Sequence, residues 1–209
     1  SYVGHPLADV LADYPSRQSV RAKYGIEEGA LVVALLPGSR VSELEAMAGL
    51  FVATAARIAV AHPQIEFLAP MVNRATRTIF ESALANYPTV RVRLFDGQSH
   101  DSIKAADVVL VASGTATLET ALLGRAMVIT YRMPRVSSWL MKNQRYQPWI
   151  GLPNILARDF VVPEILQSDA TPDRLAHAIL ELLDNEARRS SIEAQFAEMS
   201  AELRCNSAQ

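Results

Sequence analysis

The sequence predicts an α/β protein with a Rossmann-like, doubly wound parallel sheet and additional helices at the carboxy-terminal end. Two observations support this fold class. Short runs of aliphatic and β-branched residues are typical of buried strands, and the segments between them have helical spacing and are long enough for right-handed crossovers. The runs are residues 31–36, 65–69, 90–95, 107–112 and 127–131.

Helical spacing fills the intervals between these runs. After the first run, apolar residues recur at steps of three and four, which predicts a helix with one buried face. The residues on that face are Leu44, Met47, Leu50, Phe51, Thr54 and Ile58. Beyond Arg132 the alternation stops, and helices are predicted at residues 172–183 and 186–203. We therefore expect a connection with one short helix over residues 1–29, a Rossmann-like domain over 30–185 and a carboxy-terminal helix over 186–209.

The composition is that of a folded globular protein. Half of the 209 residues are hydrophobic, and 20 basic side chains nearly balance 22 acidic ones, which excludes intrinsic disorder. The longest unbroken apolar run, residues 30–36, is far shorter than the roughly 18 residues that span a bilayer, so no transmembrane helix is expected. The amino-terminal residues also lack the pattern of a secretory signal. Cys205 is the only cysteine, which excludes a disulfide framework and makes a reducing cytosol the expected setting.

Basic residues gather in one stretch of an otherwise acidic chain. No acidic residue occurs between Thr120 and Arg158, and both tryptophans, Trp139 and Trp149, lie there. The part from Arg132 to Trp149 fits either a partly packed helix with basic ends or a surface that contacts an anionic membrane or an amphiphilic substrate. Nucleic-acid binding is disfavoured, because the rest of the chain is acidic and contains no recognised nucleic-acid-binding module.

Two of the predicted strands end in turns of small residues that open helices. The first turn is Pro37-Gly38-Ser39-Arg40, and Ser42 with Glu45 fits a capping box at its helix. The second turn is Ser113-Gly114-Thr115-Ala116-Thr117. Because helix amino termini present free N–H groups and the positive end of the helix dipole, each turn can hold a phosphate.

The expected strand order brings these turns together. In the order 3-2-1-4-5 the first and fourth strands are neighbours at the switch point, so both turns face one crevice. Arg40 and the second turn would then surround one anion, and Glu119, one turn into the second helix, could accept hydrogen bonds from ribose hydroxyls. Taken alone, either turn is most often only a capped connection between strand and helix. The sequences Gly-x-Gly-x-x-Gly and Gly-Lys-Ser/Thr are absent, which argues against dinucleotide and P-loop sites.

The four histidines lack metal-ligand spacing, so no metal site is expected. His62 and His177 fit helices as solvent-facing or packing residues, and His100 is expected at a helix start. His5 lies between Gly4 and Pro6, beside a turn, where a structural role and a role in the site are both open. No Ser-His-Asp or Cys-His constellation can be assigned.

Several motifs that run in order along nearly the whole chain resemble the lipid-A-disaccharide synthase family. They are residues 2–9 (YVGHPLAD), 35–40 (LLPGSR) with Glu43, 112–119 (ASGTATLE), 131–133 (YRM), 152–157 (LPNILA), 162–164 (VPE) and 204–206 (RCN). The Ser-Gly-Thr turn alone is shared with other nucleotide-sugar transferases. The resemblance therefore depends on the whole set of motifs.

The resemblance implies one half of a two-domain GT-B glycosyltransferase that inverts the anomeric centre and uses no metal or cofactor. Such enzymes transfer 2,3-diacylglucosamine from UDP-2,3-diacylglucosamine to 2,3-diacylglucosamine 1-phosphate and release UDP, in the lipid A biosynthesis of Gram-negative bacteria. This chain would be the UDP-sugar-binding half. The acceptor site and the general base would lie in an amino-terminal domain, and the helix over 186–209 would be truncated. The expected location is the cytoplasm, at the periphery of the inner membrane. A homodimer is compatible with the resemblance.

The resemblance also assigns the site residues. The diphosphate would contact Gly38, Ser39, Arg40, Ser113, Gly114, Thr115, Ala116 and Thr117. Glu119 would bind the uridine ribose, and Asn154 would lie on the nucleotide side of the crevice. His5, near the interdomain connection, is a candidate for a catalytic role. The alternatives are another UDP-sugar transferase or epimerase of the same fold, and a nucleotide-binding or membrane-docking module without turnover.

Overall fold

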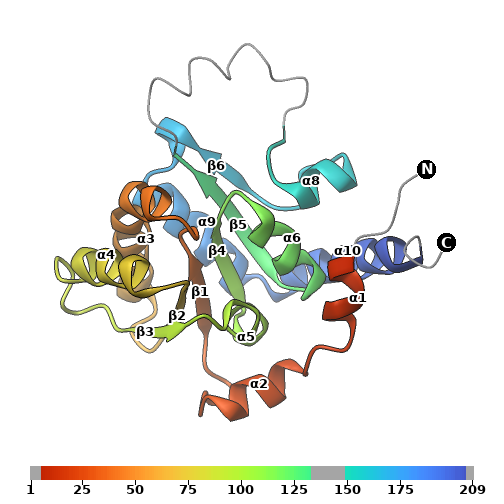
Figure 1. The fold of residues 1–209 in the computed structure, drawn as a ribbon, viewed down its shortest axis with the longest axis horizontal. Coiled ribbons are helices and arrows are strands. Elements are labelled where there is room, and N and C mark those ends of the chain that lie inside the picture. The colour runs from red at the N-terminus through yellow and green to blue at the C-terminus, as the bar shows by residue number, and fades with distance from the viewer. Residues whose placement is uncertain (1–5, 133–148, 206–209) are drawn as a thin grey trace.

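The computed structural model of the chain describes residues 6–132 and 149–205 (Figure 1). Its centre is a sheet of six parallel strands in the order β3-β2-β1-β4-β5-β6. The strands are β1 (Val32–Leu36), β2 (Glu66–Met71), β3 (Val92–Asp96), β4 (Val108–Ala112), β5 (Ala126–Tyr131) and β6 (Glu164–Leu166). The predicted fold class and the predicted order of the first five strands are confirmed, and β6 is an additional edge strand.

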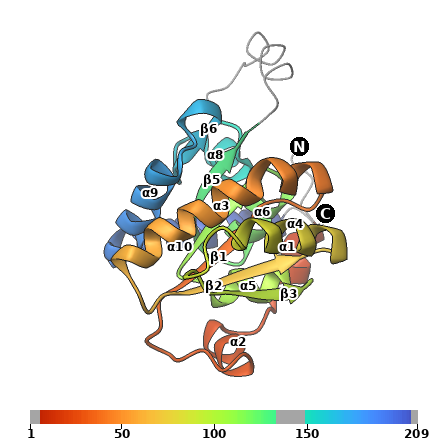
Figure 2. The same cartoon turned by 90° about the vertical axis from the view of Figure 1, so that its left-hand side faces the viewer.

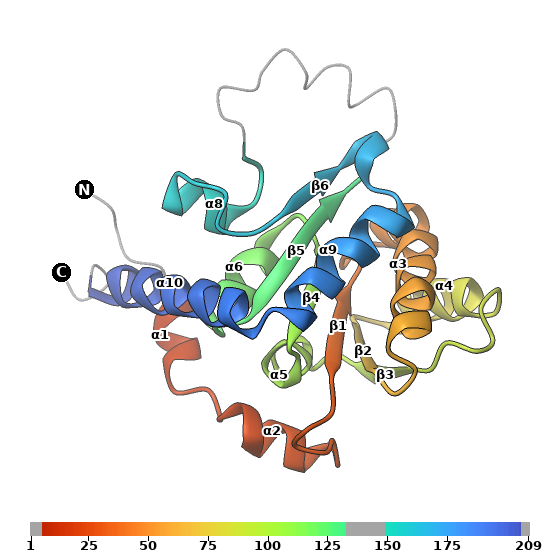
Figure 3. The same ribbon diagram turned by 180° about the vertical axis from the view of Figure 1, so that it is seen from behind.

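Helices cover both faces of the sheet, as a doubly wound fold requires (Figures 2 and 3). One face carries α3 (Val41–Ala61), α4 (Arg74–Leu84) and α9 (Pro172–Asp184), while α5 (Ser99–Ala105) and α6 (Thr115–Leu122) cover the other. The remaining helices are α1 (Pro6–Ala12), α2 (Arg17–Lys23), α8 (Leu152–Ala157), the short 3-10 helix η1 (Gln167–Asp169) and α10 (Glu186–Cys205). The last helix packs against α1, α6 and α9 and adds Ile192 and Phe196 to the core.

The sequence pattern explains the core. All five residues of β1 and all five of β4 are buried, because these central strands have helices on both faces. The predicted apolar face of α3 is buried in full, including Thr54, whose Oγ1 donates to the carbonyl of Leu50 at 2.8 Å. The prediction that residues 90–95 form a buried strand is wrong in one respect, since β3 is half-exposed. Its position at the edge of the sheet, paired with β2 alone, accounts for that exposure.

One helix of the described chain, α3, is long and apolar enough by length and composition to cross a membrane. In this fold it is a core helix. It packs against α4 and α9 on one face of the sheet, and its buried residues include Met47 and Phe51. The burial of this face explains the apolar composition without a membrane.

The connection before β1 holds two helices, α1 and α2, where the sequence predicted one. Ser16 is the N-cap of α2, and its side chain accepts a hydrogen bond from Ser19 N at 3.2 Å. A buried ion pair then fixes α2 to the sheet. Arg21 donates to Asp107 Oδ2 at 2.9 Å, and the same oxygen accepts from Val32 N at 2.8 Å. The connection is therefore tied to the starts of both β1 and β4.

Candidate functional site

The two predicted turns lie at neighbouring strand ends. Leu36, the last residue of β1, pairs with Val111 of β4, so the turns that follow these strands leave the same edge of the sheet. Helices change face between these strands, with α3 on one side and α6 on the other (Figure 1). This is the topological switch point, where open α/β sheets bind ligands. The predicted convergence of the two turns is confirmed at the level of the strands.

The first turn is shaped by Glu43. Its Oε2 accepts from Ser39 N at 2.9 Å and from Arg40 N at 3.2 Å, and its Oε1 accepts from Arg40 Nη1 at 3.0 Å. Gly38 has a φ of 125°, and a Cβ there would lie 2.7 Å from Glu43 Oε2, so the turn requires glycine. The sequence placed a capping box at Ser42 and Glu45, which is wrong. Because α3 begins at Val41, the third helical residue is Glu43.

The charges of the first turn follow from this geometry. Burial opposes ionisation of Glu43, but the two backbone N–H groups and the Arg40 guanidinium outweigh it and hold the pKa of Glu43 below its ordinary value. The backbone N–H groups of Ser39 and Arg40 are thus used in hydrogen bonds to Glu43 within the turn. The side chain of Arg40 is 79% exposed and presents its remaining N–H donors to solvent. What this turn offers a ligand is mainly the guanidinium of Arg40.

The second turn offers backbone donors. Ser113 N donates to Thr130 O at 2.9 Å, which fixes the turn to β5, and α6 begins at Thr115 after the N-cap residue Gly114. Gly114 and Thr115 are exposed, and the first N–H groups of α6 point out of the helix, where an anion can accept from them. Ser113 and Ala116 are partly exposed.

Thr117 makes hydrogen bonds within the second turn. Its side chain is buried, and its Oγ1 donates to Gly114 O at 2.7 Å. The N–H of Thr117 also donates to Gly114 O, at 3.2 Å. The predicted contact of Thr117 with a diphosphate has no support in this arrangement, because both groups close the turn. Thr117 shapes the turn that the neighbouring residues present.

Glu119 lies one turn into α6, half-buried, and meets a partner that the sequence did not indicate. Its Oε2 is 3.1 Å from His100 Nε2, in the first turn of α5. The sequence predicted His100 at a helix start, which is confirmed, but gave no partner for it. The two residues belong to different βα units, so no local spacing could have paired them.

The side chain of Asn154 makes its hydrogen bonds within the fold. It lies in α8 with no exposed surface. Its Nδ2 donates to Val162 O at 2.9 Å and to Glu164 Oε1 at 2.8 Å, while its Oδ1 accepts from Val162 N at 3.1 Å. A direct contact between this side chain and a nucleotide has no support here. Asn154 joins α8 to the segment that leads into β6.

His5 and most of the basic, aromatic stretch lie outside the described residues. This applies to residues 133–148, which include Arg135, Trp139, Lys142 and Arg145. At the borders of that segment, Arg132 donates to Ala170 O, and Trp149 makes an edge-to-face contact with Phe160 with ring centroids 6.0 Å apart. The roles predicted for His5 and for the stretch stay predictions.

Within residues 6–132 and 149–205, no group of three or more His, Cys, Asp or Glu side chains could hold a metal ion. His62, His100 and His177 each lie near one carboxylate, at 3.4 Å, 3.1 Å and 3.6 Å respectively. A single His–carboxylate pair supplies too few ligands for a structural or catalytic zinc site.

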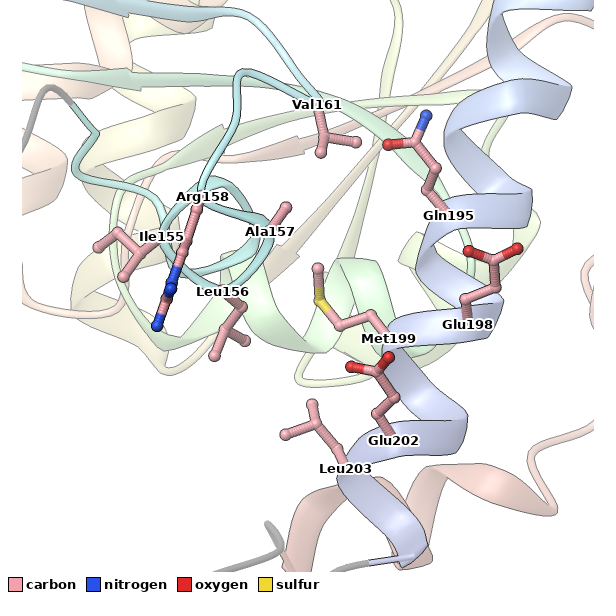
Figure 4. Close-up of a pocket in the computed structure, with 10 residues that line it drawn as sticks. All are labelled: Ile155, Leu156, Ala157, Arg158, Val161, Gln195, Glu198, Met199, Glu202 and Leu203. Carbon is pink, nitrogen blue, oxygen red and sulfur yellow. The ribbon is translucent and has the colours of Figure 1, made fainter. Parts of the chain in front are cut away.

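A separate groove of about 600 Å³ lies between α8 and α10 (Figure 4). Apolar side chains such as Leu156 and Met199 line it, together with the carboxylates of Glu198 and Glu202. None of its lining residues belongs to the predicted site. Its two carboxylates, Glu198 and Glu202, do not favour a diphosphate there.

The fold defines a class of protein: the Rossmann-like half of GT-B glycosyltransferases and the epimerases that share their fold. The chain is similar to the crystal structure of WaaG, a glycosyltransferase involved in lipopolysaccharide biosynthesis, with a TM-score of 0.64 and 16% identity over 95% of this chain and 50% of that one. It is also similar to UDP-GlcNAc 2-epimerase from Neisseria meningitidis bound to UDP-GlcNAc, with a TM-score of 0.59 and 13% identity over 96% and 52% of the two chains. These likenesses show the fold.

The family model for lipid-A-disaccharide synthetase (LpxB) matches residues 1–209, and the chain belongs to this family. It is 47% identical over 208 residues to lipid-A-disaccharide synthase of Methylobacillus flagellatus, covering 99% of this chain and 55% of that protein. It is 48% identical over 212 residues to the enzyme of Dechloromonas aromatica, covering 100% and 56%. The chain thus spans about half the length of the curated relatives that it matches.

Proposed function

We propose that this chain is the donor-binding part of a lipid-A-disaccharide synthase. The whole enzyme would transfer 2,3-diacylglucosamine from UDP-2,3-diacylglucosamine to 2,3-diacylglucosamine 1-phosphate, with release of UDP. Membership of the family supports this reaction. The observation that carries the assignment of the donor to this chain is the position of two helix-opening turns and Glu119 at the β1–β4 switch point.

In this proposal the leaving diphosphate is stabilised from two sides. The Arg40 guanidinium supplies charge-assisted hydrogen bonds, and the first N–H groups of α6 supply the positive end of a helix dipole. Negative charge accumulates on the diphosphate as the glycosidic bond breaks, so these donors stabilise the transition state more than the ground state. Gly38, Ser39 and Thr117 shape the turns, while Ser113, Gly114, Thr115 and Ala116 present their surface to the ligand.

Glu119 would bind the nucleoside. A carboxylate accepts hydrogen bonds and donates none, so it suits the two ribose hydroxyls, which are donors. Its position one turn inside α6 places it beyond the N–H groups that would hold the phosphates. The diphosphate would therefore be bound by the amino terminus of α6, and the ribose by Glu119 one turn further along the same helix. Asn154 would act only by positioning α8.

We further propose that the acceptor site and the general base lie in the part of the enzyme that this chain does not cover. The length of the relatives supports this, because this chain covers only 55% of the enzyme from Methylobacillus flagellatus. His5 of this chain is a candidate for a further catalytic role. The general base would take the proton of the acceptor hydroxyl as the sugar is transferred. The reaction would be inverting and metal-independent. It would take place at the cytoplasmic face of the inner membrane, with the basic stretch in the sequence next to anionic lipid. A homodimer is compatible with this arrangement.

A second candidate is another UDP-sugar enzyme of the same fold. The structural likeness to an epimerase bound to UDP-GlcNAc favours it as the alternative. Competition between acylated and plain UDP-GlcNAc for the 209-residue chain separates the two candidates. Stronger competition by the acylated donor supports the synthase, and equal or weaker competition supports an enzyme for an unacylated sugar. Failure of both donors to bind overturns both candidates.

A further inference from the structure

His100 is in direct contact with the carboxylate that the proposed function assigns to the ribose. The distance from His100 Nε2 to Glu119 Oε2 is 3.1 Å, and the two side chains are 31% and 21% exposed. The pair is thus partly shielded and still reaches the surface. Both the neutral ring with its hydrogen on Nε2 and the protonated ring donate a hydrogen bond to Glu119 from this position.

The imidazole of His100 is held by the connection that precedes β1. The ring of Tyr14 packs edge-on against it, with centroids 5.8 Å apart and an angle of 88° between the planes. Tyr14 in turn donates its hydroxyl to Asp101 Oδ1 at 2.5 Å. His100 therefore contacts Tyr14 as well as Glu119.

Asp101 also accepts hydrogen bonds from two side chains at the end of α2. Its Oδ2 accepts from Lys23 Nζ at 2.8 Å and from the Tyr24 hydroxyl at 2.6 Å. Asp101 follows His100 directly in α5, so these contacts fix the first turn of α5. A continuous set of contacts therefore runs from the connection, through Asp101 and Tyr14, to His100 and Glu119.

We propose that His100 is a positioning residue for nucleoside binding. Its N–H fixes the orientation of the Glu119 carboxylate by occupying Oε2, and leaves Oε1 to accept from the ribose. Without this bond the carboxylate is free to rotate, and ordering it on binding costs conformational entropy. The inference rests on the proposed function, because it concerns the same nucleoside site.

The geometry gives the test a matched set of variants. Since the contact uses Nε2, a glutamine at position 100 can place its amide nitrogen where Nε2 lies, whereas the shorter asparagine cannot. His177 on α9 supplies the control: it also lies near a glutamate, Glu181, at 3.6 Å, but is 76% exposed and outside the site. The measurements are calorimetric titrations of the 209-residue chain and its variants with uridine and with pyrophosphate, together with thermal unfolding.

We expect His100→Ala and His100→Asn to weaken uridine binding by about 3- to 10-fold, while His100→Gln and His177→Ala stay within about twofold of the wild type. Pyrophosphate binding should not change in any variant. The inference is overturned if His100→Ala leaves uridine binding unchanged, if glutamine gives no rescue, or if uridine and pyrophosphate weaken together with the unfolding temperature.

The design separates this inference from the proposed function. If Glu119→Ala weakens uridine binding and His100→Ala does not, the donor site stands and the positioning role of His100 is overturned. If the wild type binds neither uridine nor pyrophosphate, or if Glu119→Ala has no effect on uridine, the assignment of the nucleoside site fails and the inference fails with it.

Discussion

Asn154 Nδ2 and Glu164 Oε1 lie 2.8 Å apart and join α8 to the edge strand β6. The same carboxylate accepts from Ile150 N at 2.9 Å and from Gly151 N at 3.0 Å. A Cβ at Gly151 would lie 2.3 Å from Ile129 Cδ1, so the chain before α8 passes directly over β5. The motifs LPNILA and VPE, separate in the sequence, therefore form one hydrogen-bonded unit.

This unit predicts strong coupling between its two polar side chains. Asn154→Ala and Glu164→Ala should each lower the free energy of unfolding by about 1 to 3 kcal/mol, because each leaves buried partners without a hydrogen bond. The double variant should cost less than the sum, with a coupling of about 0.5 to 3 kcal/mol. Urea unfolding of the four proteins measures this. Additive losses would show that the two residues act independently.

Breaking the ion pair that fixes α2 should be costly. Arg21 and Asp107 are 5% and 9% exposed, so Asp107→Ala leaves a buried guanidinium without its carboxylate. We expect a loss of about 3 to 5 kcal/mol in the free energy of unfolding. The exposed pair of Arg57 and Asp173 is the control, and Asp173→Ala should cost far less, because ion pairs at the surface contribute little to stability. Similar losses for both variants in urea unfolding would contradict the role given to burial.

The Asp101 cluster predicts a pH dependence of stability. Burial opposes ionisation of Asp101, but hydrogen bonds from Lys23, Tyr14 and Tyr24 outweigh it and lower the pKa of its carboxyl. A carboxyl whose pKa is lower in the folded state contributes stability above its unfolded pKa, about 3.9, and loses it as the pH falls through the folded pKa. The wild type should therefore lose more stability than Asp101→Asn below about pH 4. Parallel curves from pH 3 to 7 would contradict this.

How far the sequence predicts this structure depends on how local each feature is. The aliphatic runs that form β1 to β5, and the face of α3 that includes Leu44 and Ile58, are patterns within one element and could be predicted from the sequence. The order of the strands was predicted from the common topology of doubly wound sheets. β6 was not predicted, because its three residues, 164–166, are half-exposed and too few to show the hydrophobic pattern of a strand.

In the candidate site, too, local features could be predicted from the sequence and contacts between distant residues could not. The turns were visible because Gly38 and Gly114 mark strand ends in the sequence. The contact between His100 and Glu119 was not, because it joins two helices across a separation of 19 residues. The resemblance implies that Asn154 lies on the nucleotide side of the crevice, and only the packed structure shows that its amide is used within the fold.

Nucleotide binding should not depend on a metal ion. In the described part of the chain no cluster of three or more His, Cys, Asp or Glu residues could hold a cation, and Arg40 with the α6 terminus supplies positive charge instead. UDP affinity of the 209-residue chain should be the same in EDTA and in magnesium or manganese. Affinity that is lost in EDTA and restored by either cation would contradict the prediction.

The central claim is that the turns at the β1–β4 switch point bind a uridine diphosphate, with Arg40 on the diphosphate and Glu119 on the ribose. Titration of UDP, uridine and pyrophosphate against the wild type, Arg40→Ala and Glu119→Ala tests it most directly. Arg40→Ala should weaken UDP and pyrophosphate by about 1.5 to 3 kcal/mol and flatten the salt dependence. Glu119→Ala should weaken UDP and uridine alike and leave pyrophosphate unchanged. Equal weakening of uridine and UDP by Arg40→Ala, or a wild type that binds none of the three, would contradict the account.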